Sequence, residues 1–239
     1  MATKSAAKEE RQADRPPVLP PLENGDRLSR AEFERRYEAM PNLKKAELIE
    51  GVVHVGSPVK HEGHSREHSQ VVTWLGVYVA YTPGVDGGAE SSLRMDLDSE
   101  PQPDALLRIG RTAGGQSGID PEGYIEGAPE LIAEVAATSA SYDLGTKLRV
   151  YRRHGVREYI VWRVLDGEID WFVLRDGEYR PFPPDAQGIR KSETFPGLWL
   201  DAGALLAGDM ATVLAVLRQG LDSPEHAAFV ARLIPVPGA

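Results

Sequence analysis

Two carboxylates lie in parts of the chain that otherwise predict a hydrophobic core. Asp104 begins the apolar run 105–109, and Glu134 lies in the middle of the apolar run 131–137. Short apolar runs near glycine and proline predict buried strands. An ionised carboxylate in such a strand costs on the order of several kcal/mol unless a cation balances it. The pair is therefore a candidate metal site, although an arginine or a backbone amide at a strand end would also satisfy Glu134.

A lysine follows Glu134 by thirteen residues and supplies a candidate cation. The segment 143–154 predicts a helix whose inward face carries Leu144, Leu148 and Tyr151, and Lys147 falls within the same arc at about 100° per residue. A cation that points inward requires an anionic partner. One interpretation is a structural Lys147–Glu134 pair, or a lysine whose stem covers the core while its ammonium reaches solvent.

The other interpretation is a metal-dependent hydrolytic site. Two carboxylates on adjacent strands suit Mg²⁺ or Mn²⁺, because such an ion keeps several of its waters and needs only one or two protein carboxylates. The metal lowers the pKa of a bound water and withdraws charge from a phosphodiester oxygen. A nearby lysine then orients or deprotonates the nucleophile and stabilises the charge that develops.

The first half of the chain supplies elements on the N-terminal side of Asp104. Residues 1–27 are rich in proline and charge and predict a mobile arm. A capping-box pattern at 29–32 predicts a helix that stops near Pro41. The segment 46–55 predicts two strands that turn at Glu50-Gly51. Apolar residues at helical spacing predict a long helix over 64–81, and a strand is expected near 91–97.

The second half predicts alternating strands and helices around Glu134. The polar, glycine-rich segment 110–127 is interpreted as a lid or as a surface excursion. Strands at 158–164 and 169–174, with Asp-Gly turns after each, predict an antiparallel meander. A helix over 202–220 and a short tail end the chain. These elements predict an α/β fold with a mixed sheet flanked by helices.

Composition restricts the class of protein. The 239 residues include no cysteine, which excludes disulfides and thiolate metal sites, and the formal net charge is −9. An acidic chain is a poor candidate for non-specific coating of nucleic acid, although a local basic groove is compatible with it. The sequence contains no apolar run of about 20 residues and no signal-peptide core, so we expect a soluble cytoplasmic protein without a membrane partner.

Several stretches of the sequence, in order, resemble the PD-(D/E)XK nuclease superfamily. The resemblance is strongest to its bacterial branch of "putative restriction endonucleases" and covers about residues 28–207. The matching stretches are Glu47-Leu48-Ile49-Glu50-Gly51, Gly56-Ser57-Pro58 followed by His64, Pro101-Gln102-Pro103-Asp104, 127–135, and 143–148 leading through Tyr151 to 155–159. The order of these stretches is far more specific than an Asp, Glu and Lys trio alone.

The resemblance implies a restriction-endonuclease-like core with an added antiparallel meander. It also implies that Asp104 and Glu134 bind Mg²⁺ or Mn²⁺ and that Lys147 completes the catalytic set. The superfamily usually carries its lysine two residues after the glutamate, where this chain has Ala136. The branch that this chain resembles has the lysine on the following helix, which matches Lys147. The domain prediction is an arm at 1–27, a nuclease domain at 28–207 and a C-terminal helical extension at 208–239.

The resemblance also assigns expectations to residues outside this trio. Glu47 matches an acid that acts as a further metal or water ligand, whereas a solvated acid near a turn is the alternative. His64 matches a position that contacts phosphate or a metal-bound water. With its neighbours His61 and His68 it could also hold a transition metal on one helical face, but the polar surroundings of all three favour a solvated helix start. The charged face formed by Arg149, Arg152, Arg153 and Arg157 either contacts DNA or is simply solvated.

The leading functional hypothesis is a metal-dependent endonuclease that hydrolyses DNA phosphodiester bonds. Many nucleases of this fold act as dimers, so a homodimer is a further expectation. The alternative from another class is a catalytically silent binding or scaffold protein that retains the fold. Hydrolysis of RNA or of a smaller phosphoester is a third hypothesis, because nothing in the sequence indicates readout of bases.

Overall fold

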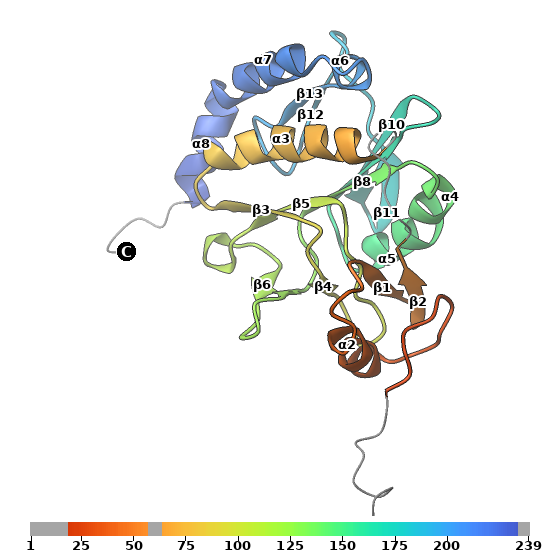
Figure 1. Cartoon of the computed structure of the whole chain (residues 1–239). Coiled ribbons are helices and arrows are strands. Elements are labelled where there is room, and N and C mark those ends of the chain that lie inside the picture. Colours follow the sequence, from red (N-terminus) through yellow and green to blue (C-terminus); the bar gives the residue numbers. More distant parts are fainter. Residues whose placement is uncertain (1–18, 57–63, 234–239) are drawn as a thin grey trace, which may run out of the picture.

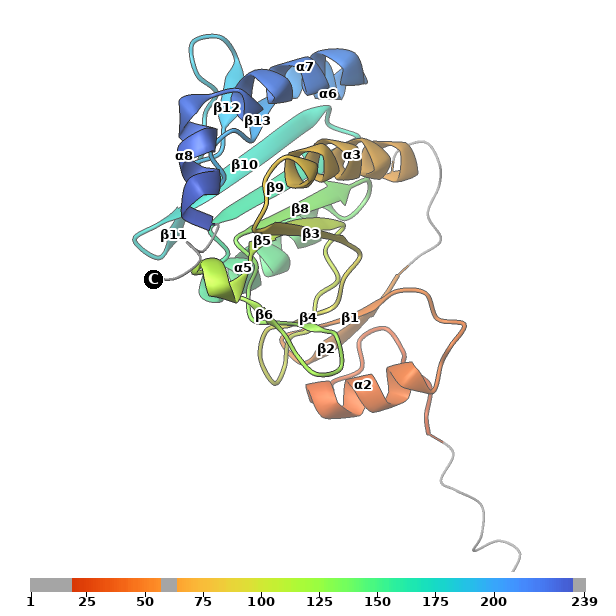
Figure 2. The same cartoon turned by 90° about the vertical axis from the view of Figure 1, so that its left-hand side faces the viewer.

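A six-stranded mixed sheet forms the centre of the molecule (Figures 1 and 2). The computed structural model describes residues 19–56 and 64–233. The strand order is β11-β10-β9-β8-β5-β3, in which β8 and β9 are parallel and every other neighbouring pair is antiparallel. The strands are β3 (Val85–Ala89), β5 (Ala105–Ile109), β8 (Leu131–Ala136), β9 (Glu158–Arg163), β10 (Glu168–Arg175) and β11 (Glu178–Pro181). The predicted α/β fold with a mixed sheet and an antiparallel meander is confirmed.

Helices cover both faces of this sheet (Figure 2). One face packs against α3 (Arg66–Ala80), α6 (Ala202–Leu206), α7 (Met210–Leu221) and α8 (Pro224–Leu233). The other packs against α5 (Leu148–Arg153), which follows the short α4 (Ala140–Tyr142) and the π-helical turn η3 (Asp143–Lys147). Successive strand side chains alternate between these faces, so Leu107 and Ala133 join the α3 side, whereas Leu106 and Ile132 join the α5 side.

A small N-terminal unit packs beside the sheet. It comprises α2 (Arg30–Glu38) and the hairpin of β1 (Ala46–Ile49) and β2 (Val52–Val55). Phe33 of α2 packs in one small core with residues of both strands. The hairpin turns at Glu50 and Gly51, both with positive φ (51° and 75°), as a tight two-residue turn requires. Leu48 and Glu100 exchange backbone hydrogen bonds of 3.1 and 2.6 Å. The predicted hairpin is thus confirmed, and these bonds hold it next to the start of β5.

The segment 110–127 is a surface excursion with short strands. A 3₁₀ turn, η2 (Arg111–Ala113), precedes β6 (Gly118–Ile119) and β7 (Ile125–Glu126), and β7 pairs with β4 (Leu93–Arg94). Arg94 fixes this three-stranded sheet to α2, because its guanidinium contacts Glu34 at 2.7 Å and Asp120 at 2.6 Å. The strand predicted near 91–97 therefore shrinks to two residues, since only these two find a partner strand.

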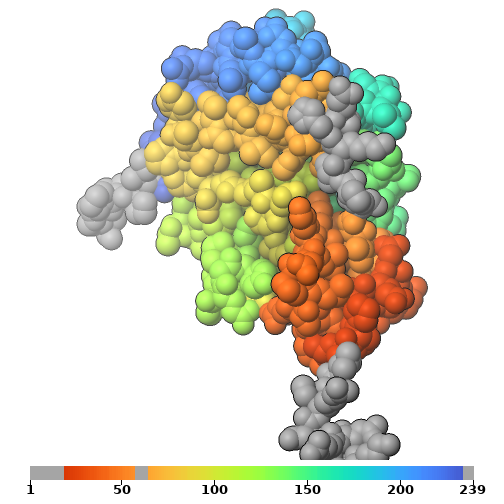
Figure 3. All heavy atoms as spheres, in the orientation of Figure 1, coloured from red at the N-terminus to blue at the C-terminus, as the bar shows by residue number. Residues whose placement is uncertain are grey.

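Other predicted elements differ from the structure at glycines and at the C-terminus. The edge strand β3 was not predicted, because Gly87 and Gly88 give its sequence little strand character. The helix expected over 202–220 breaks at Gly208, which has a φ of 74°. The expected short tail forms α8 over most of its length. Figure 3 shows α3 and the C-terminal helices as adjoining bands on one surface.

The described residues bear on two further expectations. Val213, Leu217 and Phe229 are buried in the same core as α3 and the central sheet. The boundary predicted between 207 and 208 stays a prediction, although it separates helices that share this core. No helix in the described part of the chain has both the length and the apolar character to span a bilayer.

A separate antiparallel hairpin is formed by β12 (Ile189–Lys191) and β13 (Trp199–Asp201).

Candidate active site

Strand register brings Asp104 and Glu134 together. Ala105 pairs with Ala133 across β5 and β8, so the next step along this antiparallel register places Asp104 opposite Glu134. Both residues share the parity of Leu106 and therefore point to the α5 face. The Asp104 amide donates to Glu134 Oε2 at 3.4 Å. Two residues thirty positions apart in the chain thus form adjacent carboxylates, each 3% exposed.

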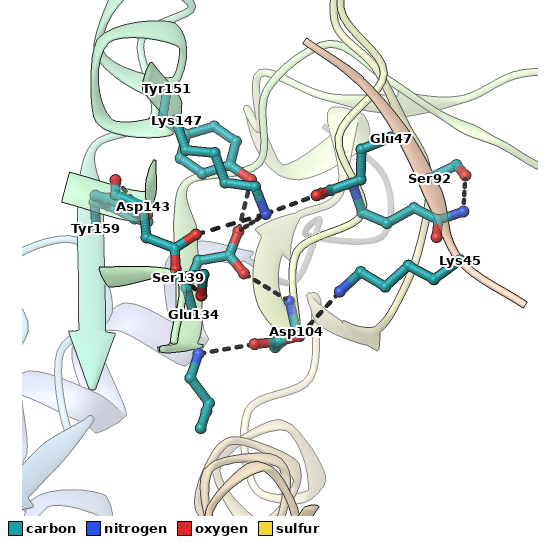
Figure 4. Close-up of polar contacts among 12 residues, drawn as sticks. Lys45, Glu47, Ser92, Asp104, Glu134, Ser139, Asp143, Lys147, Tyr151 and Tyr159 are labelled. Atoms are coloured by element: carbon teal, nitrogen blue, oxygen red, sulfur yellow. Dashed lines mark hydrogen bonds and ion pairs between the residues drawn. The ribbon is translucent and has the colours of Figure 1, made fainter. Parts of the chain in front are cut away.

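Glu134 also accepts hydrogen bonds from the helical layer above it (Figure 4). Its Oε1 accepts from Lys147 Nζ at 2.9 Å and from the Tyr151 hydroxyl at 2.8 Å. Burial raises the pKa of Glu134 above its ordinary value, because Lys147 does not fully offset burial and the nearby Asp104 charge. The carboxylate is well fixed in position, yet its environment still favours additional positive charge.

Lys147 lies at the centre of a carboxylate cluster. Its Nζ is 2.9 Å from Glu47 Oε1, 2.9 Å from Glu134 Oε1 and 3.8 Å from Asp143 Oδ1. Burial by itself lowers the pKa of Lys147, but the carboxylates of Glu134, Glu47 and Asp143 outweigh burial and raise it well above its ordinary value. The ammonium therefore stays protonated at neutral pH and is poorly suited to accept a proton.

A π-helical turn, η3, carries Lys147 at the start of the predicted helix. Asp143, Lys147, Val150 and Tyr151 are buried, whereas Leu148 is only partly buried. The predicted inward position of Lys147 is confirmed, and the arc is centred closer to Lys147 than the leucine pattern indicated. A single-turn π-bulge of this kind often marks a functional site.

Asp104 has cationic partners on its other side. Its Oδ1 is 3.1 Å from Lys45 Nζ, and its Oδ2 accepts from the Val135 amide at 2.8 Å and lies 3.6 Å from His64 Nε2. Burial alone raises the pKa of Asp104, but the His64 interaction, Lys45 and the Val135 amide hold it well below its ordinary value. The Asp104 carboxylate raises the pKa of His64 despite partial burial. His68 Nε2 contacts the Asp104 carbonyl at 2.8 Å.

Glu47 and Asp143 complete the cluster from two different elements. Glu47 in β1 accepts from the Gln102 amide at 2.7 Å through the same Oε1 that contacts Lys147. Asp143 Oδ2 accepts from the Ser139 hydroxyl at 2.6 Å. Burial raises the pKa of Asp143, and Lys147 opposes this shift. The N-terminal hairpin and η3 therefore each add one carboxylate to the pair on the sheet.

The charges of the cluster fit a divalent cation. Four buried carboxylates, those of Glu47, Asp104, Glu134 and Asp143, face the two ammonium groups of Lys45 and Lys147. Among the described residues, no group of three or more histidine or acidic side chains is arranged to hold a metal ion. A hydrated Mg²⁺ or Mn²⁺ needs only one or two carboxylates. Asp104 and Glu134, which lie next to each other, are the two that could supply them.

The structure brings most of the predicted site residues together. Asp104, Glu134, Lys147 and Glu47 form one connected network, and His64 lies at its edge. His61 lies outside the described residues. Two arginines of the predicted charged face are engaged in ion pairs, because Arg152 contacts Glu178 and Arg153 contacts Glu50 and Asp96.

Three members of the network were not predicted from the sequence. Asp143 is four residues before Lys147, a spacing that places both on one helix face. Lys45 is two residues before Glu47, and residues at that spacing share one side of a strand. Tyr151 was assigned to the helix's inward face, but its hydrogen bond to Glu134 was not foreseen. The spacing signals for Asp143 and Lys45 were therefore present in the sequence.

The sequence matches the model of one protein family over most of its length. Residues 30–203 match the model of the Uma2 family, which is described as "Putative restriction endonuclease". The chain belongs to the Uma2 family. All members of the carboxylate–lysine network, from Lys45 to Tyr151, lie within the matched Uma2 segment. The resemblance identified from the sequence is confirmed.

Solved structures support the same fold. Four chains of solved structures match this Uma2 protein. One is a "putative nuclease belonging to DUF820" from Anabaena variabilis, with 16% identity and a TM-score of 0.51, covering 72% of this chain and 97% of that chain. At this identity the likeness supports the fold alone. No curated protein matches the sequence.

Proposed function

We propose that this protein is a Mg²⁺- or Mn²⁺-dependent endonuclease that hydrolyses DNA phosphodiester bonds. The observation that carries the proposal is the pair of buried carboxylates, Asp104 and Glu134, whose strand register brings them together within a cluster that has more acids than bases. Membership of the Uma2 family supports the reaction class. The proposal includes a homodimer, in which two such sites cut the two DNA strands.

The residues of the cluster would divide the chemistry between them. Asp104 and Glu134 would hold the metal, and Glu47 would act as a further ligand or hold a water. The bound ion would supply Lewis acidity toward a water and a phosphodiester oxygen. Lys147 and Tyr151 keep Glu134 Oε1 fixed, so that Oε2 stays directed toward Asp104. The low pKa of Asp104 keeps it ionised throughout the neutral range.

Relaxation of supercoiled plasmid in the presence of Mn²⁺ tests the proposal. We expect Asp104→Asn and Glu134→Gln to reduce nicking by at least about 100-fold, because each removes a charged ligand. Glu193→Gln is the matched control, since it removes an exposed carboxylate that pairs with Arg175. The proposal fails if both site variants nick plasmid as fast as the wild type.

The substrate class and oligomeric state are tested with the same protein. Rates on supercoiled DNA, single-stranded DNA and RNA should be highest for DNA. Analytical ultracentrifugation should give twice the mass of the chain. The pairing of Arg152 and Arg153 with acids favours a second candidate, a silent binding protein with the same fold. A wild-type protein that shows neither cleavage nor a metal-dependent rise in melting temperature would select that candidate.

A further inference from the structure

Lys147 and Lys45, the two lysines of the cluster, differ in how many of their hydrogen-bond donors a ligand could use. Lys147 is 3% exposed, and its ammonium contacts Glu47 and Glu134 at 2.9 Å and Asp143 at 3.8 Å. An ammonium has three donors. Two carboxylates lie at hydrogen-bond distance from its donors and a third lies at 3.8 Å, so Lys147 could approach a phosphate only by giving up ion pairs with buried acids.

Lys45 points toward Asp104 in the same cluster (Figure 4). Its side chain is 28% exposed, and within the described part of the chain its ammonium has one hydrogen-bond partner, Asp104 Oδ1 at 3.1 Å. Two of its three donors are thus available to a ligand that approaches from solvent. The cation is also next to the Asp104 carboxylate, which the proposed function assigns to the metal.

The β1–β2 hairpin explains why Lys45 is placed there. Ala46 pairs with Val55, and the Gly56 amide donates to the Lys45 carbonyl at 3.0 Å, so the ladder extends one residue beyond both strands. Alternation then puts Lys45 and Glu47 on the same side. A Cβ at Gly56 would lie 3.1 Å from the Lys45 Cβ, so the glycine leaves room for the lysine stem.

A phosphate that approaches the acidic cluster from the Lys45 side is stabilised by a cation there. A phosphodiester carries a negative charge, and it would approach four buried carboxylates. Lys147 is enclosed by three of them and neutralises charge inside the cluster. Lys45 is therefore the better placed of the two to contact an incoming phosphate oxygen, with the strong hydrogen bonds that charged partners form.

We propose that Lys45 is the catalytic lysine that contacts the scissile phosphate, and that Lys147 is a positioning residue that holds Glu47 and Glu134. The assignment rests on the proposed endonuclease function. It differs from the expectation drawn from the resemblance, in which Lys147 has the catalytic role.

The test compares Lys45→Met with Lys44→Met, which removes the same charge from the adjacent exposed position. Methionine keeps most of the apolar stem of lysine. Two quantities are measured for each protein: Mn²⁺ affinity by calorimetry without DNA, and plasmid nicking at saturating Mn²⁺. We expect Lys45→Met to bind Mn²⁺ at least about fivefold more tightly, because a cation next to Asp104 is removed. We expect its nicking to fall at least about 100-fold.

Two further variants separate a contact with phosphate from a structural ion pair. Lys45→Arg should recover part of the nicking, since a guanidinium also binds phosphate. Gly56→Ala, which crowds the lysine stem, should reduce nicking while leaving Mn²⁺ affinity within about twofold. Lys44→Met should match the wild type in both measurements.

The outcomes distinguish this assignment from the proposed function. If the wild type nicks plasmid and Lys45→Met nicks it equally fast, the assignment of Lys45 is wrong and the endonuclease proposal stands. A Lys45→Met protein that binds Mn²⁺ more weakly and melts at a lower temperature shows a structural pair with Asp104, which also overturns the assignment. If the wild type neither binds Mn²⁺ nor nicks, both proposals fail together.

Discussion

Replacement of Lys147 by methionine should destabilise the protein strongly. The ammonium contacts two carboxylates at 2.9 Å and a third at 3.8 Å, and the lysine is 3% exposed. Removal of one partner of a buried ion pair typically costs about 3–5 kcal/mol. For a domain of this size, each kcal/mol lowers the melting temperature by about 2–4 °C. We therefore expect Lys147→Met to melt about 6–20 °C below the wild type.

The size of this loss should depend on pH. Burial already raises the folded-state pKa values of Glu134 and Asp143, and loss of the ammonium that opposes this shift raises them further above their unfolded values. The folded variant therefore binds more protons than the unfolded chain, and its stability falls as pH rises. The deficit relative to the wild type should be larger at pH 8 than at pH 5.

Thermal unfolding by circular dichroism, at both pH values and without metal, measures these differences. Lys44→Met provides the matched control, because it removes one positive charge from an exposed neighbouring position on the hairpin side of the cluster. It should melt within about 2 °C of the wild type. A Lys147→Met protein that melts as high as the wild type at pH 8 would refute the argument that Lys147 neutralises the cluster.

Two further predictions concern parts of the molecule away from Lys147. Burial and the nearby Glu34 raise the pKa of Glu100 to about 8 from an ordinary 4.5, so the folded state loses stability as pH rises through this interval. In urea titrations, Glu100→Gln should therefore gain up to about 4 kcal/mol of stability relative to the wild type between pH 5 and pH 9. Deletion of residues 208–239 removes Val213, Leu217 and Phe229 from the main core, and burial of each of these side chains stabilises the fold by about 1.5–3 kcal/mol. The truncated chain should therefore lose cooperative unfolding in calorimetry. A cooperative transition near the wild-type temperature would instead support the predicted domain boundary.

The parts of the fold that the sequence predicted well are those specified by local chemistry. Glu50-Gly51 predicted the tight turn because both positions need positive φ. Helical spacing predicted α3, whose Trp74 and Tyr78 are buried against the sheet. The strand β3 was missed because its identity depends on pairing with β5 rather than on its own residues.

The candidate site was predictable as a set of residues but not as a geometry. Burial of a charged residue identified Asp104 and Glu134, and helical phase identified Lys147. Their contact depends on the pairing of β5 with β8, and sequence alone does not state which strands pair or in which register. Lys45 was missed for a related reason, because its role depends on where the hairpin docks against the sheet.

The docking of the N-terminal hairpin also has a consequence for the newly made chain. Lys147 follows Glu47 by 100 residues, which a ribosome adds in about 5–20 s. During that interval the hairpin can form locally, but its carboxylate has no ammonium to pair with. We expect the cluster to assemble only after the segment that carries Lys147 has left the ribosome, so a nascent chain shorter than this would lack the complete site.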